Sequence, residues 1–398
     1  MRTFSRQCVQ GVERARFLSG DEQEGRGMAI IEAQYRRRCG LTDSVKLTAM
    51  VKAGGCAAKL SPGTLDAILR RLPLPTDPNV LVGFSTNDDA GVYLLGEGLA
   101  LVQTVDFFTP VVDDPFTFGQ IAAANSLSDV YAMGGRPVSA LSIVGFPEKS
   151  DPAILEQILR GGLSKTGEAN CSVIGGHSIR IEDIVFGYAV TGVINPLQVW
   201  RNVGAQTNDV LLLTKALGTG VISTALKKEC AEKTSLDAAI ASMTQLNRAA
   251  AEALHELESQ AGKRCVHAVT DVTGFGLLGH AREMALGDAA LGIARVAFEI
   301  VAADVPLLPG ALDAARQGMI SGGLKNNREF LGDCVGFAAN VPEENRTLLF
   351  DPQTSGGLLI ALAAEHEEAT RQSLERHGVS AKRIGRVVPK TDKLLMVV

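Results

Sequence analysis

The chain has 398 residues, of which 46% are hydrophobic and 21% charged, and its formal net charge is -5. This length predicts two domains with full cores, and the acidic balance argues against a nucleic-acid-binding protein. No apolar run is long enough to cross a bilayer, no signal-peptide core stands at the N-terminus, and the seven cysteines form no CxxC pair. We therefore expect a reduced, cytoplasmic setting.

The first 79 residues divide into two segments. Residues 1–40 are rich in arginine without a clear period, which predicts a loosely ordered extension. Residues 41–79 carry a glycine-rich stretch and then Ser61-Pro62, a typical helix start, so we expect a helix over 63–71. Three prolines then indicate a linker over 72–79.

Short apolar runs separated by polar turns dominate the next part of the chain, which we assign to an N-terminal domain over 80–200. The expected strands are 80–84, 91–95, 100–105, 140–146, 171–174 and 186–193. Aspartate-proline pairs predict helix starts at 114–115 and 151–152, with the helices ending near 133 and 167. This order favours helices packed on a mixed sheet.

A second α+β domain is expected over 201–398, with the join near 195–208. The apolar patterns predict strands at 209–214, 266–269, 292–298, 356–362 and 394–397. Helices are expected at 221–228, 235–258, 279–285 and 312–317. The predicted fold class is therefore α+β with two domains.

The glycine-rich stretch between Lys52 and Lys59 is a candidate catalytic segment. Gly54 and Gly55 allow close backbone approach, and Cys56 is a soft nucleophile whose pKa a nearby cation would lower. Lys59 supplies such a cation three residues on. We hypothesise that Cys56 holds or guides a soft substrate atom as a thiolate. The alternative is that Cys56 is a buried cysteine that packs the loop.

Four aspartates stand at strand ends or on a facing helix: Asp89, Asp106, Asp129 and Asp271. Carboxylates so placed suit Mg²⁺, which takes few protein oxygens and completes its octahedron with phosphate oxygens. Asn125 lies one helical turn before Asp129 and shares its face. Aspartate at such positions also serves local hydrogen bonding, and the spacing does not show that the four converge.

A G-x-G-x-x-G pattern at Gly274–Gly279 follows a predicted strand and opens a predicted helix. With Glu299 further on, it supports a rival hypothesis, a nicotinamide-dependent oxidoreductase. The flanking order is not a clean βαβ series, and Asp271 would repel a pyrophosphate unless a cation bridged them. Elsewhere, Gly175-Gly176-His177 follows a predicted strand and allows close approach to a nucleotide.

Together these motifs resemble the selenophosphate synthetase (selenide, water dikinase) family of the AIR synthetase-like (PurM-like) superfamily. The resemblance covers residues 41–398, outside the first forty. The segments that carry it are Gly54–Pro62, Asn87–Ala90, Thr104–Phe108, Ala124–Gly135, Gly175–Ser178, Thr270–His280 and Asp351–Gly357.

The resemblance implies that ATP, selenide and water give selenophosphate, AMP and orthophosphate, which supplies activated selenium for selenocysteine and selenium-containing tRNA. It implies catalytic roles for Cys56 and Lys59. The implied magnesium ligands are Asp89, Asp129 and Asp271, with Asp106 at the nucleotide and metal site. The implied nucleotide contacts are Lys59, Thr86, Asn87, Asp88, Asp106, Asp129, Gly175, Gly176 and His177.

The family fold further implies a homodimer that pairs through its N-terminal sheets. The cofactor that the resemblance implies is Mg²⁺, with K⁺ as a candidate second cation, and a selenium-delivery protein is a candidate partner. No contact with nucleic acid or membrane is expected. Two departures are visible: Ala58 replaces a second cysteine found in some members, and Asn326 replaces the family arginine in Gly322–Asn327, where Lys325 or Arg328 could substitute.

Three alternatives stay open beside this interpretation. AIR synthetase and thiamine-phosphate kinase share the logic of the ATP site, but the segment from Cys56 to Lys59 argues against them. The oxidoreductase hypothesis depends on the glycine pattern at 274–279. A catalytically silent nucleotide or selenium carrier is disfavoured because the chain keeps Cys56, Lys59 and the four aspartates.

Overall fold

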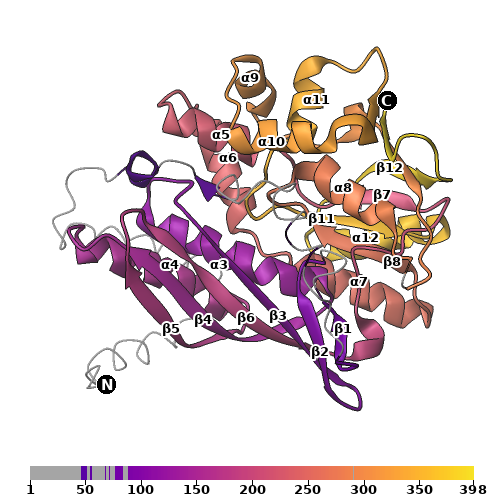
Figure 1. Cartoon of the computed structure of the whole chain (residues 1–398), viewed down its shortest axis with the longest axis horizontal. Coiled ribbons are helices and arrows are strands. Elements are labelled where there is room, and N and C mark those ends of the chain that lie inside the picture. The colour runs from indigo at the N-terminus through magenta and orange to yellow at the C-terminus, as the bar shows by residue number, and fades with distance from the viewer. Residues whose placement is uncertain are drawn as a thin grey trace. The chain divides into compact units, whose positions relative to one another are not determined.

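Figure 1 shows the computed structural model, in which helices flank two β-sheets. The structure describes residues 46–51, 54–55, 68, 71, 77–83, 88–289 and 291–398. The predictions for residues 1–45, for Cys56, Lys59, Thr86 and Asn87, and for most of the helix over 63–71 lie outside the described residues.

The first sheet has six strands in the order β1-β2-β3-β6-β4-β5. Neighbouring strands are antiparallel except β4 and β5, which run parallel. The strands are β1 Val80–Val82, β2 Gly91–Gly96, β3 Leu99–Phe108, β4 Arg136–Phe146, β5 Ser172–Arg180 and β6 Val185–Ile194. The predicted mixed sheet is confirmed, although β5 continues through the glycines at 175 and 176, where the strand was expected to have ended.

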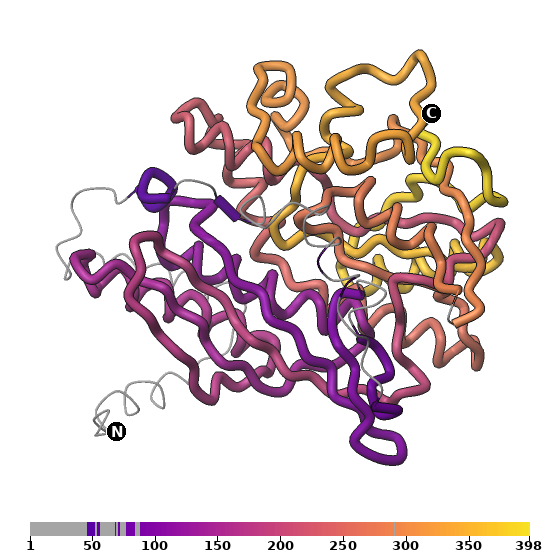
Figure 2. Tube along the Cα trace, viewed as in Figure 1, coloured from indigo at the N-terminus to yellow at the C-terminus, as the bar shows by residue number. Residues whose placement is uncertain are grey.

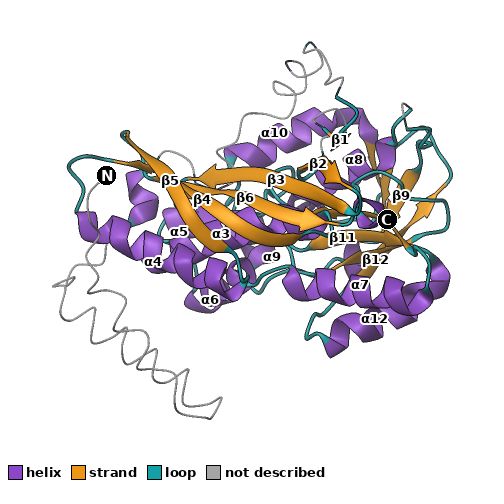
Figure 3. Ribbon diagram, turned by 90° about the horizontal axis from the view of Figure 1, so that it is seen from below, coloured by secondary structure: helices purple, strands orange, loops and turns teal. Residues whose placement is uncertain are grey.

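Helices α3 (Pro115–Ala132) and α4 (Pro152–Glu168) pack on one face of this sheet (Figure 3). Both begin as predicted, because the carboxylates of Asp114 and Asp151 accept hydrogen bonds from first-turn backbone nitrogens. Between helix and sheet, the ring of Phe186 packs edge-on against Phe118 and Tyr188. These rings are fully buried, so the core of the first sheet lies on its helical side.

The second sheet has seven strands in the order β10-β13-β9-β12-β7-β11-β8. They span β7 Val210–Leu213, β8 Val266–Asp271, β9 Ala297–Ile300, β10 Val335–Phe337, β11 Leu358–Leu362, β12 Lys382–Val388 and β13 Leu395–Val397. Strands β7 and β11 are buried at every residue, which explains their uninterrupted apolar sequences. In Figure 2 the indigo-to-magenta first sheet lies beside the second sheet, whose strands run from rose to yellow.

The sequence prediction for the elements around the second sheet is incomplete, because strands β10 and β12 and the last three helices were not expected, and it is wrong in two further places. The helices are α5 Thr219–Lys227, α6 Lys233–Thr244, α7 Arg248–Ala261, α8 Gly276–Leu286, α9 Ala311–Arg316, α10 Gly322–Leu331, α11 Glu343–Leu349 and α12 Glu367–Arg376. The single helix expected over 235–258 is wrong: it is interrupted at Gln245–Asn247, where tertiary hydrogen bonds engage both residues. The strand expected over 292–298 is also wrong, because β9 begins only at Ala297.

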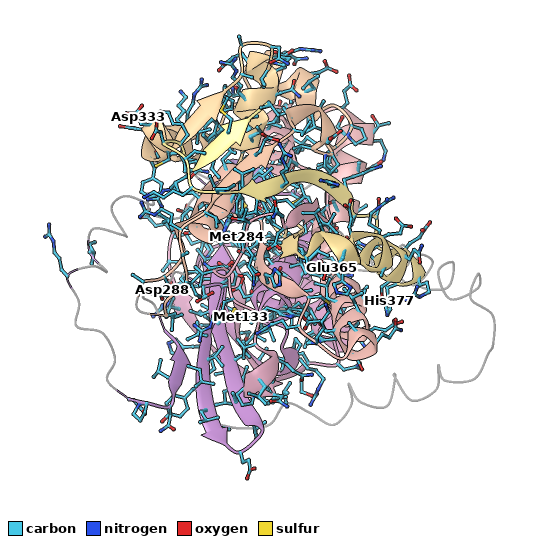
Figure 4. The ribbon with its side chains drawn as sticks, turned by 90° about the vertical axis from the view of Figure 1, so that its right-hand side faces the viewer. Met133, Met284, Asp288, Asp333, Glu365 and His377 are labelled. Carbon is cyan, nitrogen blue, oxygen red and sulfur yellow. The ribbon has the colours of Figure 1, made fainter. Side chains whose placement is uncertain are left out.

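Apolar side chains lie in the interior and charged side chains lie at the surface, as hydrophobic burial requires. Met133 and Met284 lie inside the fold, whereas Asp333 and Glu365 lie at its surface (Figure 4). Among the described residues, no helix is long and apolar enough to cross a membrane.

Candidate active site

Asp106 lies on β3, and its side chain points to the helical face, where it is 7% exposed. Its Oδ2 atom accepts a hydrogen bond from Nδ2 of Asn125 on α3. The hydroxyl of Ser126 donates to the backbone oxygen of Asp106 at 2.8 Å. Strand and helix therefore hold this carboxylate in one orientation.

Asp129 follows one turn after Asn125 on the same face of α3, as the spacing predicts. Its Oδ2 atom accepts a hydrogen bond from the hydroxyl of Thr104. Thr104 and Asp106 lie two residues apart on β3 and thus on the same face of the strand. The predicted pair Asp106 and Asp129 is therefore brought to one region between β3 and α3.

Asp89 stands in the turn before β2 and is joined to the second sheet. Its Oδ1 atom accepts a 2.8 Å hydrogen bond from the hydroxyl of Thr270 on β8. Burial raises the pKa of Asp89 well above its ordinary value, and the nearby charges of Asp271 and Asp129 raise it further. Asp129 and Asp271 are thus both close enough to Asp89 to disfavour its charged form.

This cluster is compatible with a divalent cation, although it does not form a complete ligand shell. Among the described residues, no group of three or more His, Cys, Asp or Glu side chains is arranged to hold a metal ion. The Oδ2 atom of Asp89 is buried without a hydrogen-bond partner, which is costly unless a cation or donor meets it. Mg²⁺ bound largely through phosphate oxygens needs few protein ligands, so these carboxylates fit it.

The loop that precedes β11 contacts α3 beside these aspartates through Ser355. Ser355 has a left-handed backbone with φ of 50°, a strained conformation for a residue other than glycine. Its backbone nitrogen donates to Oδ1 of Asn125 at 2.7 Å, and its carbonyl accepts from Nζ of Lys215 at 2.9 Å. Burial lowers the pKa of Lys215 to about 7, against the opposing effect of nearby Asp271.

The other predicted nucleotide residues are divided between two places. Asp88 lies beside Asp89, and its Oδ1 atom accepts from the backbone nitrogen of Asn202 at 2.7 Å. Gly175, Gly176 and His177 lie instead on β5, at the exposed edge of the sheet. Gly176 is in register with Asp106 through β4 and β6, and three strand spacings separate them by roughly 14 Å. Within one chain they do not meet the aspartates.

The dinucleotide interpretation of Gly274–Gly279 is wrong. The glycines do follow β8 and open α8, but β8 is an edge strand whose described partner, β11, runs antiparallel to it. A dinucleotide fingerprint requires a parallel βαβ unit. Gly276 instead has φ of 69°, and a Cβ there would lie 2.8 Å from the Phe350 carbonyl carbon, so glycine serves close backbone packing.

Sequence reasoning missed several polar residues around the cluster: the half-buried Thr104 and the buried Asn202, Lys215, Asn247, Thr270, Asp351 and Gln353. Asp351 Oδ2 accepts from the nitrogens of Gly220 and Val221 at the start of α5, and burial raises the pKa of Asp351 to about 7. The segment Asp351–Gly357, which carries part of the family resemblance, could have indicated Asp351 and Gln353. Its sequence does not reveal which elements these two residues contact.

The replacement of the family arginine can also be placed. Asn326 lies on α10 and lines a cavity beside Gly54 and Thr354. The guanidinium of Arg328, one of the two candidate replacements, pairs with Glu343 at 2.6 Å. Lys325 is exposed.

Two family models match the chain in tandem. Residues 87–194 match the N-terminal domain of AIR synthase related proteins, and residues 206–397 match the C-terminal domain. The described β2 to β6 fall in the first match, and all seven strands of the second sheet fall in the second.

Similar solved structures agree on the fold. Thiamine monophosphate kinase from Aquifex aeolicus superposes with a TM-score of 0.57 over 84% of this chain and 96% of that chain, at 20% identity. The hydrogenase maturation protein HypE in complex with ATP superposes with a TM-score of 0.55 over 81% of this chain and 88% of its own, at 19% identity. At such identities the likeness concerns the fold alone, and it confirms the predicted AIR synthetase-like class.

Sequence relatives are much more similar. A selenide, water dikinase of Pelobacter propionicus is 48% identical over 90% of this chain and 100% of its own length. That of Geobacter metallireducens is 46% identical over 89% and 99%, and selenide, water dikinase 2 of Peptoclostridium acidaminophilum is 44% identical over 89% and 98%. The chain therefore belongs to the selenide, water dikinase family of AIR synthase related proteins.

Proposed function

We propose that this chain converts ATP, selenide and water into selenophosphate, AMP and orthophosphate. Family membership supports the reaction, and one structural observation supports its location. Asp89, Asp129 and Asp271 come from three distant parts of the sequence, and their charges raise the pKa of Asp89 together with burial. Perturbed, converging carboxylates of this kind mark functional sites.

The reaction requires two phosphoryl transfers. In the first, hydroselenide attacks the γ-phosphorus of ATP, a selenium–phosphorus bond forms, and the bond to the β-phosphate oxygen breaks to release ADP. In the second, water takes the β-phosphoryl group of ADP, which leaves AMP and orthophosphate. Both transfers depend on positioning and charge stabilisation more than on covalent chemistry with the protein.

Asp89, Asp129 and Asp271 would hold magnesium, with Asp106 at the border of the nucleotide. Bound Mg²⁺ would neutralise the phosphate charge and orient the transferred groups. Two hydroxyl groups of the chain orient these carboxylates. Thr104 donates a hydrogen bond to Asp129, and Thr270 donates one to Asp89. Asn125 orients Asp106.

We assign the first transfer to Cys56 and Lys59. Lys59 would stabilise the γ-phosphoryl group as it moves, and Cys56 would hold or guide selenium as a thiolate. Thr86, Asn87 and Asp88 would contact the nucleotide, because they immediately precede Asp89 in the sequence. Since ATP is a cytoplasmic substrate, we place the enzyme in the cytoplasm; a selenium-delivery protein stays a prediction.

We further propose a homodimer formed through the first sheet. The face of that sheet opposite α3 and α4 exposes large apolar side chains, among them Val105 at 57%, Phe107 at 49% and Ile179 at 53%. A contiguous apolar face of this kind is typical of an interaction surface. His177 is in register with Ile143 across this sheet, so pairing of two copies would bring Gly175, Gly176 and His177 to the interface. These residues would then act on a nucleotide held by the other copy.

Product analysis tests the reaction. The purified full chain is incubated anaerobically with ATP and Mg²⁺, with and without selenide, and nucleotides and phosphorus–selenium species are quantified. We expect AMP and selenophosphate only with selenide, and loss of both in Lys59→Ala. The matched control is Lys228→Ala, an exposed lysine outside the proposed site.

Two outcomes would contradict the proposal. ADP as the stable end product would indicate another reaction of the superfamily, and turnover indifferent to selenide would remove selenide as substrate. For Cys56, unchanged selenide-dependent turnover in Cys56→Ser would show that the thiol only packs its loop.

A further inference from the structure

A cavity of about 270 Å³ is lined by Thr48, by Gly54 and by residues of the helices α5 and α10, and none of the four aspartates is among its described lining residues. Pro110 and Val111 form one apolar wall, and Pro352 forms part of another. Gly54 also lines it, two residues before Cys56 in the sequence. None of the interactions described above uses this space.

The start of α10 contributes hydrogen-bond donors to the cavity. Ser321 caps the helix by accepting from the nitrogen of Leu324 at 3.2 Å, which leaves the first-turn nitrogens of Gly322 and Gly323 without intrahelical acceptors. Ser321, Gly322 and Gly323 all line the cavity. A Cβ on Gly322 would meet no atom within 4 Å, so the approach to these nitrogens is open.

Thr354 provides a second and independent indication of a ligand. It is 6% exposed and lines the cavity. Its backbone nitrogen donates to the hydroxyl of Thr219, but its own hydroxyl makes no hydrogen bond within the described part of the chain. A Cβ on Gly55 would lie 2.7 Å from that hydroxyl oxygen, so glycine at 55 leaves room beside it. This oxygen is not among the fully buried side-chain atoms that lack a partner, so it is accessible from the cavity and can donate to a ligand there.

The charge of the cavity is opposite to that of the aspartate cluster. Among its described lining residues, Lys227 is charged and none is acidic. Two carboxylates lie behind the walls: Asp113 accepts from the hydroxyl of Thr48, and Asp351 accepts from the nitrogen of Gly220. Each accepts from a wall group, although Oδ1 of Asp351 is buried without a hydrogen-bond partner. The Nζ atom of Lys227 also donates to the backbone oxygen of Val51, so the described lining offers one hydrogen-bonded cation and several neutral donors.

We propose that this cavity is the binding site for the selenium substrate, hydroselenide, before its transfer. This inference rests on the proposed function. Hydroselenide is a monoanion at neutral pH, and it is large, polarisable and weakly hydrated. A lining with one ammonium, hydroxyl and amide donors, and proline and valine walls suits such an ion. A phosphate dianion is more strongly hydrated and would need more charge or a metal.

Steady-state kinetics test the proposal. Thr354→Val removes the unpaired hydroxyl with little change of shape, and Lys227→Gln removes the ammonium. At saturating ATP and Mg²⁺, we expect each variant to raise the KM for selenide roughly tenfold, because each loses a hydrogen bond or ion pair to a charged ligand. The KM for ATP should stay within about twofold, because the cavity does not bind the nucleotide.

Controls separate this result from misfolding and from a failure of the proposed function. Lys228→Gln, next to Lys227 but outside the cavity, should leave both KM values unchanged, and thermal midpoints should match the wild type. Selenide KM values within twofold of the wild type in both variants would overturn the assignment. A change only in inhibition by orthophosphate would also overturn it, in favour of a phosphate site. Absence of selenide-dependent AMP in the wild type would instead contradict the reaction itself.

Direct observation provides a further test. Crystals of the full chain soaked anaerobically with selenide should show selenium anomalous density between α10 and Thr354. Density only at the aspartate cluster would overturn the proposal.

Discussion

The side-chain oxygen of Asn125 accepts a 2.7 Å hydrogen bond from the backbone nitrogen of Ser355. The amide nitrogen of the same side chain donates to the carboxylate of Asp106. One buried amide therefore joins a carboxylate of the first sheet to a strained loop of the second sheet. The orientation of Asp106 thus depends on how the two sheets are packed.

Replacing Asn125 by alanine should impair the use of magnesium-bound ATP. Asp106 would lose a buried hydrogen bond to a charged group, and we expect kcat/KM to fall roughly 10- to 100-fold. The concentration of Mg²⁺ that gives half-maximal rate should rise. Initial rates of AMP formation over a Mg²⁺ titration measure both effects.

Asn247→Ala is the matched control for this prediction. Asn247 also joins α3 to the same loop, through Ser128 and the carbonyl of Gly356, but neither partner is a carboxylate. It should lower the thermal midpoint without shifting the Mg²⁺ dependence. If both variants raised the Mg²⁺ concentration for half-maximal rate equally, Asn125 would affect activity only through the stability of the fold.

Asp89→Asn should stabilise the metal-free protein while abolishing turnover. The native carboxylate is disfavoured by burial and by Asp271 and Asp129, and an amide removes the charge while still accepting from Thr270. Thermal unfolding in EDTA should therefore give a higher midpoint for the variant than for the wild type. A lower midpoint would show that the carboxylate is not under electrostatic strain.

Asp351→Asn should change how stability depends on pH. Burial raises the pKa of Asp351 from its ordinary 3.8 to about 7. Between these values the native state keeps a proton that the unfolded state has lost, so wild-type stability falls as the pH rises from about 4 to 7. The variant lacks this loss. Its urea midpoint should therefore improve relative to the wild type over that window and stay level above it.

Parallel pH profiles for the two proteins would contradict this prediction. Lys215, whose pKa is lowered to about 7, contributes in the other direction, because stability regains its contribution as the pH rises from about 7 toward 10.5. It is present in both proteins, so its contribution cancels in the difference.

Phe107→Glu should dissociate the proposed homodimer. Phe107 is 49% exposed on the apolar face of the first sheet, and a charge there would be buried without a partner on association. Sedimentation velocity should show a shift from dimer to monomer at micromolar concentration. Leu197→Glu, at a residue that is 85% exposed on η4 (Pro196–Gln198), should leave the dimer intact. A monomeric wild type would contradict the dimer outright.

Local sequence was sufficient for several elements of the fold. Asp114-Pro115 and Asp151-Pro152 predicted two helix starts, because an acidic cap and a proline at the first helical position act within a single turn. The spacing of Asn125 and Asp129 placed both on one helix face.

Local sequence failed where tertiary contacts override it. The helix expected over 235–258 is divided because Gln245 and Asn247 are engaged by Lys215, Ser128 and Gly356 from other elements. The glycine pattern at 274–279 suggested a dinucleotide turn because spacing does not report whether the neighbouring strand is parallel. Here that neighbour, β11, is antiparallel.

The sequence by itself determined the family and the residue types of the proposed site: aspartates beside apolar strands, a glycine-rich segment with Cys56 and Lys59, and the motif at 351–357. Only the tertiary structure decided which of these groups meet. Thr270 bonds to Asp89 across 181 positions and Ser355 bonds to Asn125 across 230. Such pairs form because α3 packs against β8, α6 and α7 of the second half, and that packing is a property of the whole chain that no local pattern records.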